Sequence, residues 1–140
     1  MTGTTTTRTR RAVAGLVVLG ALGSGAGVLT APAHASGGDD DRVVRTGSCS
    51  GAASWKLKAK TDDGRLEVEG EVDSNRTGQT WEWTIRSNGD VVARGTSRTA
   101  GRSGSFSVER KIRNAAGPDQ LVFRASKNGG GDTCVGRLTF

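Results

Sequence analysis

The sequence predicts an all-β fold. From residue 42 onward, apolar residues recur at every second position between clusters of turn residues, as in half-buried strands. No segment shows the period of a helix, and the turn signals come at the spacing of hairpins. The pattern gives seven or eight strands, which favours a single antiparallel sandwich of immunoglobulin-like type over residues 42–140. A closed β-barrel is the alternative.

The first strands carry complementary charges. After a short strand at residues 42–46, Trp55–Lys60 alternates apolar residues with three lysines, and Leu66–Val72 alternates apolar residues with three glutamates. A hairpin through the turn at residues 61–64 places the lysine row beside the glutamate row on the solvent face. We therefore interpret the glutamates as a solvated, neutralised row and not as catalytic carboxylates.

The next hairpin is signalled by Asn88-Gly89, since both central residues of a tight hairpin turn must tolerate positive φ. Before it, the segment 81–86 has two tryptophans and an isoleucine on one face. After it, residues 91–98 form the returning strand.

Three more strands complete the predicted fold. They are centred on residues 106–112, 121–125 and 134–140, and the loops that precede them contain residues 100–104, 114–118 and 129–131 respectively.

The first 35 residues form a signal peptide in this interpretation. Basic residues at positions 8, 10 and 11 precede the apolar stretch Ala12–Leu22, and Ala33-His34-Ala35 has the small-x-small pattern of a cleavage site, which places cleavage after Ala35. Arg10-Arg11 also fits a twin-arginine signal loosely, so the export route stays open. Residues 36–41 form a flexible acidic lead-in. No second apolar run is present, so we expect a secreted protein that is not embedded in a membrane.

Removing this leader changes the charge. It holds three of the 20 basic residues and none of the 14 acidic ones, so the net charge falls from +6 to +3. The remaining basic residues are spread along the chain and are not interleaved with aromatic residues. Nucleic acid is therefore not an expected partner.

The two cysteines, Cys49 and Cys134, lie near opposite ends of the predicted domain. An even number of cysteines in an exported chain indicates a disulfide, although two free thiols are the alternative. The bridge would close nearly the whole domain.

Several segments resemble a family of small secreted actinobacterial proteins of unknown function. The matching segments are Gly47-Ser48-Cys49-Ser50, Ser54–Lys58, Glu69–Trp81, Gly104–Val108 and the late Cys134. The resemblance implies an exported β-sandwich with one disulfide. It brings no known activity, so it assigns no functional residue.

The composition argues against catalysis. His34, the one histidine, leaves with the leader, and the chain has no tyrosine. This removes Ser-His and Cys-His nucleophile pairs and histidine metal sites. The three aspartates at positions 39–41 lack the alternating spacing of a calcium loop. We expect no enzyme activity, no cofactor and no metal.

Two sets of residues could form a ligand surface. The first would stack tryptophan on sugar and hydrogen-bond the sugar through neighbouring loop residues; the alternative is that the tryptophans pack in the core and the loop residues form a turn. This set comprises Trp81, Trp83, Asp73, Asn75, Arg76 and Gln79. The second set would attract anionic polymers if its members converge on one face. It comprises Arg94, Arg98, Arg102 and Arg110, with Lys111 and Arg113 nearby.

The favoured hypothesis is a non-catalytic extracellular binding or interaction module at the cell envelope. Its partner would be cell-wall or anionic polysaccharide, or another extracellular protein. The alternatives are a structural secreted domain without ligand and a secreted protease inhibitor that presents Arg76 or Arg102 on a loop.

Overall fold

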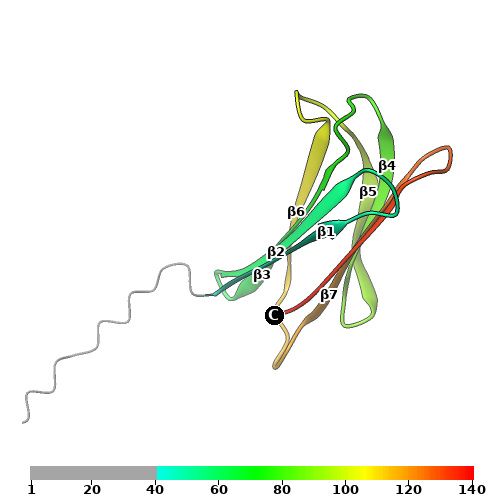
Figure 1. Ribbon diagram of the computed structural model, residues 1–140. Helices are drawn as coiled ribbons and strands as arrows, with labels where there is room; N and C mark the ends of the chain where they lie inside the picture. Colours follow the sequence, from blue (N-terminus) through cyan, green and yellow to red (C-terminus); the bar gives the residue numbers. More distant parts are fainter. Residues whose placement is uncertain (1–40) are drawn as a thin grey trace, which may run out of the picture. The chain divides into compact units, whose positions relative to one another are not determined.

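The computed structural model describes residues 41–140. The expected signal peptide at 1–35 and all of the lead-in at 36–41 except Asp41 lie outside the described residues. The described part contains eight strands and no helix, so the predicted all-β class is confirmed (Figure 1). The strands are β1 (Arg42–Ser48), β2 (Ser54–Asp62), β3 (Arg65–Asp73), β4 (Thr80–Ser87), β5 (Asp90–Arg98), β6 (Ser105–Arg113), β7 (Gln120–Lys127) and β8 (Thr133–Thr139).

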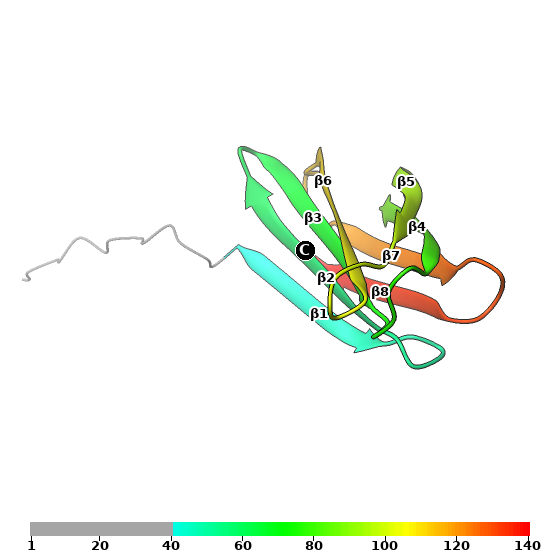
Figure 2. The same cartoon turned by 90° about the horizontal axis from the view of Figure 1, so that it is seen from above.

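The strands form two four-stranded antiparallel sheets. Sheet A has the order β1-β2-β3-β6, and sheet B has the order β5-β4-β7-β8. The chain crosses between the sheets after β3, after β5 and after β6. Figure 2 shows the two layers from above. The strands therefore form an immunoglobulin-like sandwich, and the barrel alternative is wrong because the two sheets have separate edges.

Two local signals fixed the hairpins. Asp63 and Gly64 join β2 to β3, Asn88 and Gly89 join β4 to β5, and all four residues have positive φ. Two-residue turns with this geometry match the twist of the strands beside them. One irregularity was not expected: a β-bulge between Ile85 and Arg86 sets two residues of β5 against one of β4.

The core lies between the sheets and is built from the residues that alternate inward. Aromatic rings at three places lie directly over glycine. The ring of Phe123 covers Gly70 on the opposite sheet, and the ring of Trp83 covers Gly95 on the neighbouring strand. The indole of Trp55 fills the positions beside Gly47 and Gly136. The buried apolar residues are Ala53, Leu57, Ala59, Leu66, Val68, Val72, Trp81, Trp83, Ile85, Phe106, Val108, Ile112, Leu121, Phe123, Ala125, Cys134 and Leu138.

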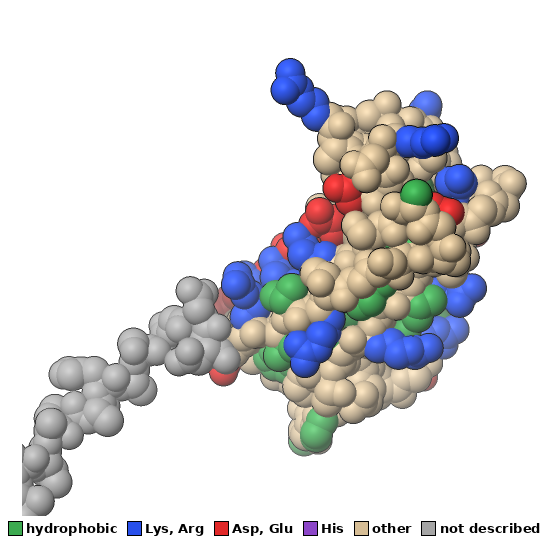
Figure 3. All heavy atoms as spheres, viewed as in Figure 1, with side chains coloured by type: hydrophobic (Ala, Val, Ile, Leu, Met, Phe, Trp, Pro, Cys, Tyr) green, Lys and Arg blue, Asp and Glu red, His purple; other side chains and the backbone are tan. Residues whose placement is uncertain are grey.

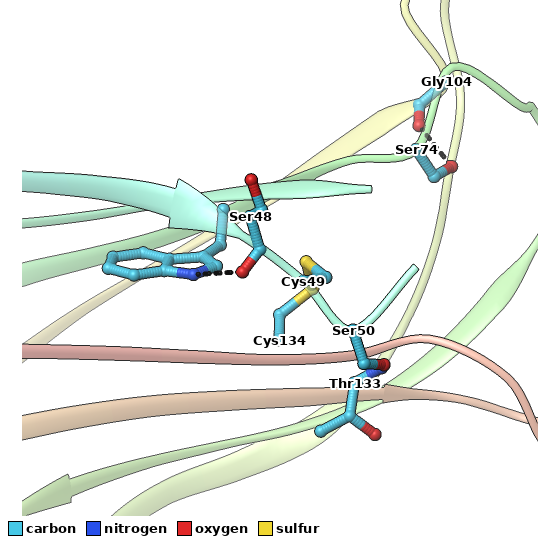
Figure 4. Close-up of a disulfide and its surroundings, with 8 residues drawn as sticks. Ser48, Cys49, Ser50, Ser74, Gly104, Thr133 and Cys134 are labelled. Atoms are coloured by element: carbon cyan, nitrogen blue, oxygen red, sulfur yellow. Dashed lines mark hydrogen bonds between the residues drawn. A yellow bond between two sulfur atoms is a disulfide. The ribbon is translucent and has the colours of Figure 1, made fainter. Parts of the chain in front are cut away.

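The two ends of the sandwich differ. One end has the tight β2–β3 and β4–β5 turns, the β6–β7 loop and both ends of the described chain (Figure 1). The other end has the remaining four loops. Here Cys49, just after β1, forms a disulfide with Cys134 in β8, so the predicted bridge is confirmed (Figure 4). Ser50 pairs with Thr133 beside it, and the Ser50 N–H donates to the Thr133 carbonyl over 2.8 Å.

Both edge strands of sheet A carry an arginine at a position that alternates inward. Arg45 in β1 pairs in register with the core residue Leu57, and Arg110 in β6 pairs with the core residue Val68. The guanidinium carbon of Arg110 lies 5.0 Å from the centre of the Trp83 ring, a cation–π contact. Each edge of sheet A therefore presents a charge in place of an apolar side chain.

Candidate functional site

The outer face of sheet A is a neutralised ladder, as the alternation predicted. Lys56, Lys58 and Lys60 of β2 lie opposite Glu71, Glu69 and Glu67 of β3 in register. All three lysines form ion pairs with these glutamates, and Lys60 Nζ lies 3.0 Å from Glu67 Oε1. Lys111 of β6 pairs with Asp62 at the end of β2.

These ion pairs shift the pKa values of Glu69 and Lys56. The hydrogen bond from Lys58 lowers the pKa of Glu69, and its charge adds to the effect against the opposing effect of burial. The hydrogen bond to Glu71 raises the pKa of Lys56. Both shifts favour the charged forms, so this face stays an ion-paired ladder at neutral pH.

The outer face of sheet B has a different composition. Its outward positions carry five exposed arginines and no lysine. Two carboxylates lie near them: Glu82 in the centre of the face and Asp90 at the β4–β5 turn. Every ion pair of residues 41–140 uses a lysine, and none of them uses an arginine. Figure 3 shows basic and acidic side chains interleaved on the left of the domain and a group of basic ones at the lower right. The arginines of sheet B are Arg86, Arg94, Arg98, Arg124 and Arg137.

A shallow open hollow lies in the middle of this arginine face. Its wall includes the arginines Arg94 and Arg124, with Thr84 between them in register. The next row along the strands places Glu82 between two hydroxyl residues, Thr96 and Ser126. Guanidinium and hydroxyl groups donate hydrogen bonds, so the hollow offers donors to an anionic group.

Trp81 and Trp83 are buried in the core, and Trp55 is partly buried against it. Trp81 is fully buried and its ring centre lies 6.3 Å from that of Phe106, while Trp83 is 4% exposed and its Nε1 donates to Ser97 Oγ over 3.0 Å. Trp55 is half-buried, and its Nε1 donates to the Ser48 carbonyl over 3.2 Å. Within residues 41–140, therefore, neither Trp81 nor Trp83 presents a face on which a sugar could stack.

The loop residues of the first candidate set build the β3–β4 loop. Asp73 Oδ1 accepts from the Asn75 N–H over 3.0 Å, and Asn75 has φ of 56°. The Gln79 N–H donates to Thr99 Oγ1, and the same hydroxyl donates to the Arg76 carbonyl over 2.6 Å. These contacts tie the loop to the β5–β6 loop.

A third bond, from Ser74 Oγ to the Gly104 carbonyl over 3.0 Å, adds to this bracing, and Figure 4 shows it at the disulfide end. The backbone of Arg76 is thus fixed, while its side chain is exposed. Arg102 lies in the turn of the β5–β6 loop, where Gly101 and Gly104 have positive φ, so the chain there is turned and not extended.

The basic residues of the second candidate set do not share one face. Arg94 and Arg98 lie on the outer face of sheet B, but Lys111 and Arg113 lie on the outer face of sheet A. Arg110 sits at the sheet A edge. The cause is the crossing between β5 and β6, which puts consecutive strands into opposite sheets.

Sequence reasoning missed three members of the arginine face. Arg86, Arg124 and Arg137 lie on β4, β7 and β8, and β4 neighbours β7 in sheet B although β5 and β6 separate them in the chain. Their outward phase on each strand was readable from the alternation. The order of the strands was not, and it is the order that brings them together.

No three His, Cys, Asp or Glu side chains of residues 41–140 come together as metal ligands. The buried carboxylate of Asp119 accepts hydrogen bonds from Ser87, Asn88 and the Ala115 N–H, which fixes the β6–β7 loop. No helix in this part of the chain is long and apolar enough to cross a membrane.

No family model, curated protein or solved structure matches this chain. The resemblance to small secreted actinobacterial proteins therefore stays an expectation.

Proposed function

We propose that this chain is an exported, non-catalytic binding module that attaches to an anionic polymer of the cell envelope through the arginine face of sheet B. The observation that carries the proposal is the contrast between the two faces. The lysines of sheet A are neutralised by carboxylates of the same face, whereas the five arginines of sheet B surround one central carboxylate, Glu82, and none of the five takes part in an ion pair within residues 41–140.

Arginine suits this role. Its planar guanidinium presents five donors, binds phosphate or carboxylate with two parallel hydrogen bonds, and is more weakly hydrated than an ammonium group. Five such groups around a single central carboxylate give the face a local positive field that attracts polyanions.

The location supports the same function. The sequence predicts export, and the Cys49–Cys134 disulfide is consistent with an oxidising, extracellular compartment. Polymers that carry phosphate or uronate groups are abundant outside cells. Without its leader the chain has a net charge of +3, which favours binding to such polymers.

A polymer fits the face better than a protein partner does. Protein interfaces centre on buried aromatic and large apolar anchors. Val92, 42% exposed, is the one large apolar side chain exposed in residues 41–140. The inhibitor alternative needs a braced loop that presents an arginine on extended backbone. The β3–β4 loop is braced, but the positive φ of Asn75 and Gly78 turns the chain on both sides of Arg76, and Arg102 also lies in a turn.

The test is retention of the disulfide-bonded domain on beads that carry purified anionic wall polymer, with neutral dextran beads as the reference. We expect retention at low salt that is lost as ionic strength rises. Replacing Arg94 and Arg124 together by glutamine is expected to reduce retention strongly.

The matched control replaces Arg42 and Arg113, two exposed arginines on the outer face of sheet A, by glutamine. The change in net charge is the same, so equal losses in both variants would show a general charge effect and not a site. Absence of retention on every anionic polymer would favour a structural domain without ligand.

A further inference from the structure

We infer that the arginine face binds one linear polymer whose phosphodiesters are separated by three-carbon polyol units, and that the polymer runs across the strands of sheet B. This inference rests on the proposed function and adds to it the ligand class, the orientation and the number of phosphates held. The registers of the four strands of sheet B carry it.

The first step is the position of four arginines. Arg94 and Arg124 lie in one row, on either side of Thr84, because both pair with Thr84 in register. Arg86 and Arg137 lie in the next row, on either side of Val122. In the strand order β5-β4-β7-β8, the arginines therefore follow one another as 94, 86, 124 and 137, alternating between the two rows.

The second step is the spacing. Neighbouring strands lie about 4.8 Å apart, and two residues along a strand span about 6.7 Å. Successive arginines in this zigzag are therefore about 8 Å apart at their Cα atoms. The zigzag as a whole crosses the sheet perpendicular to the strands. All four side chains are exposed.

The third step is the match to a polymer repeat. A glycerol phosphate polymer has six backbone bonds from one phosphorus to the next. Three bonds of an extended peptide span at most about 3.6 Å, so six bonds span about 7 Å. Flexible arginine side chains absorb the remaining difference, so consecutive phosphates meet consecutive guanidinium groups.

The surroundings define the track. On one side of the zigzag, Glu82 lies in the row of Thr96 and Ser126, and its carboxylate repels phosphate from that row. Arg98 lies beyond Glu82, and its guanidinium reaches toward Gly78 of the β3–β4 loop. Glu82 thus separates Arg98 from the zigzag, although both belong to the same face.

The hydroxyl and donor groups favour a polyol phosphate. Thr84 lies between the two arginines of its row and can exchange hydrogen bonds with a polyol hydroxyl. Arg86 donates from Nη1 to the Gly89 carbonyl over 2.9 Å, which fixes its guanidinium and leaves its other donors for phosphate. A nucleic acid strand has a similar phosphate spacing, but no aromatic side chain is exposed on this face for its bases to stack on.

The experiment is isothermal titration of the disulfide-bonded domain with synthetic glycerol phosphate oligomers of one, two, four and eight units. We expect affinity to rise up to four units and to change little from four to eight. Glutamine at Arg86, Arg124 or Arg137 is expected to weaken binding of the four-unit oligomer about two- to fivefold each. Each of these variants should also lower the slope of log affinity against log salt, because each removes one charge from the contact.

Arg98→Gln is the matched control on the same face. We expect it to reduce the affinity and the salt slope less than the zigzag variants do, because Arg98 adds to the positive field of the face without contacting a phosphate. Equal losses in Arg98→Gln and Arg124→Gln, or equal affinity for two and four units, would show that the polymer does not follow the zigzag of four arginines. The proposed function would still stand. Tighter binding of an oligogalacturonate or an oligothymidylate of equal charge would overturn the polyol phosphate assignment. If the domain also fails to bind anionic polymer beads, the proposed function itself is lost.

Discussion

At the scale of single residues, three glycines decide how the aromatic core packs. Gly70, Gly95 and Gly136 face aromatic rings closely enough that any Cβ would overlap ring carbons. A ring over a glycine covers exposed backbone and keeps the strand regular, which offsets the poor strand propensity of glycine. These glycines are required for space, since none of the three has positive φ.

The first prediction concerns Gly70. A Cβ there would lie 2.5 Å from Phe123 Cδ2, so Gly70→Ala is expected to destabilise the domain by about 1–3 kcal/mol. Urea unfolding followed by tryptophan fluorescence measures the change. Adding Phe123→Leu to Gly70→Ala should cost less than the sum of the two single changes, because the smaller side chain gives the new methyl room. Additive losses would show that ring overlap is not the cause.

The alternation of apolar residues predicted which residues are buried in the core, but not which of them contact one another across the sheets. The alternation assigned Leu57, Val68 and Ile85 to the interior because a strand places every second side chain on one face. It could not indicate that Gly70 lies under Phe123, because this contact joins opposite sheets. Nor could it indicate the bulge at Arg86.

At the scale of secondary structure, the β2–β3 hairpin is the element that the sequence describes best. The local turn fixes the register, and the register pairs each lysine with a glutamate. The pKa of Glu69 is lowered and that of Lys56 is raised, so the ladder stabilises the fold between acid and alkaline limits.

The second prediction gives the sign of this pH dependence. An unfolded glutamate has a pKa of about 4.3, so stability from Glu69 is present above that pH and is lost as pH falls through its lower folded pKa. Stability from Lys56 is present below about pH 10.4 and is lost as pH rises through its higher folded pKa.

We expect Glu69→Gln to lose about 0.2–1 kcal/mol at pH 7 and to converge with the parent at low pH. Urea unfolding midpoints between pH 2.5 and 7 measure both the loss of stability at pH 7 and the convergence with the parent at low pH. The control is Glu109→Gln, because Glu109 lies opposite Glu69 in register and forms no ion pair in the described part of the chain. A difference between Glu69→Gln and its parent that does not change with pH would contradict the ladder.

The arginine face shows where element-level prediction stops. Each strand of sheet B could be predicted with its outward positions, yet the pairing of β4 with β7 joins strands far apart in the chain, and no local signal records it. The zigzag of arginines could therefore be recognised only from the strand order in the structure. The same crossing of the chain separated β5 from β6 and divided the predicted basic cluster.

At the scale of the whole molecule, the disulfide joins strand regions 85 residues apart in the chain. In the chain-entropy model, closing a loop of that length stabilises the fold by about 4–5 kcal/mol. A domain of this size has a total stability of about 5–15 kcal/mol, so the bridge supplies a large part of it.

The third prediction is that replacing Cys49 and Cys134 together by serine removes about 4–5 kcal/mol of the free energy of unfolding. Urea unfolding of the double variant and of the parent reduced with dithiothreitol measures the loss, and the two should agree. An unchanged midpoint would show that the bridge constrains the unfolded chain little. The arginines lie on the outer face of sheet B, whereas Cys134 is buried on the inner face of β8, so the folded variant should still bind the polymer beads.

The two edge arginines have a consequence for crowded surfaces. A strand from another copy could extend sheet A only by burying the guanidinium of Arg45 or Arg110, and a buried unpaired charge is costly. Under the proposed function, copies that gather on one polymer are therefore not expected to join edge to edge through sheet A.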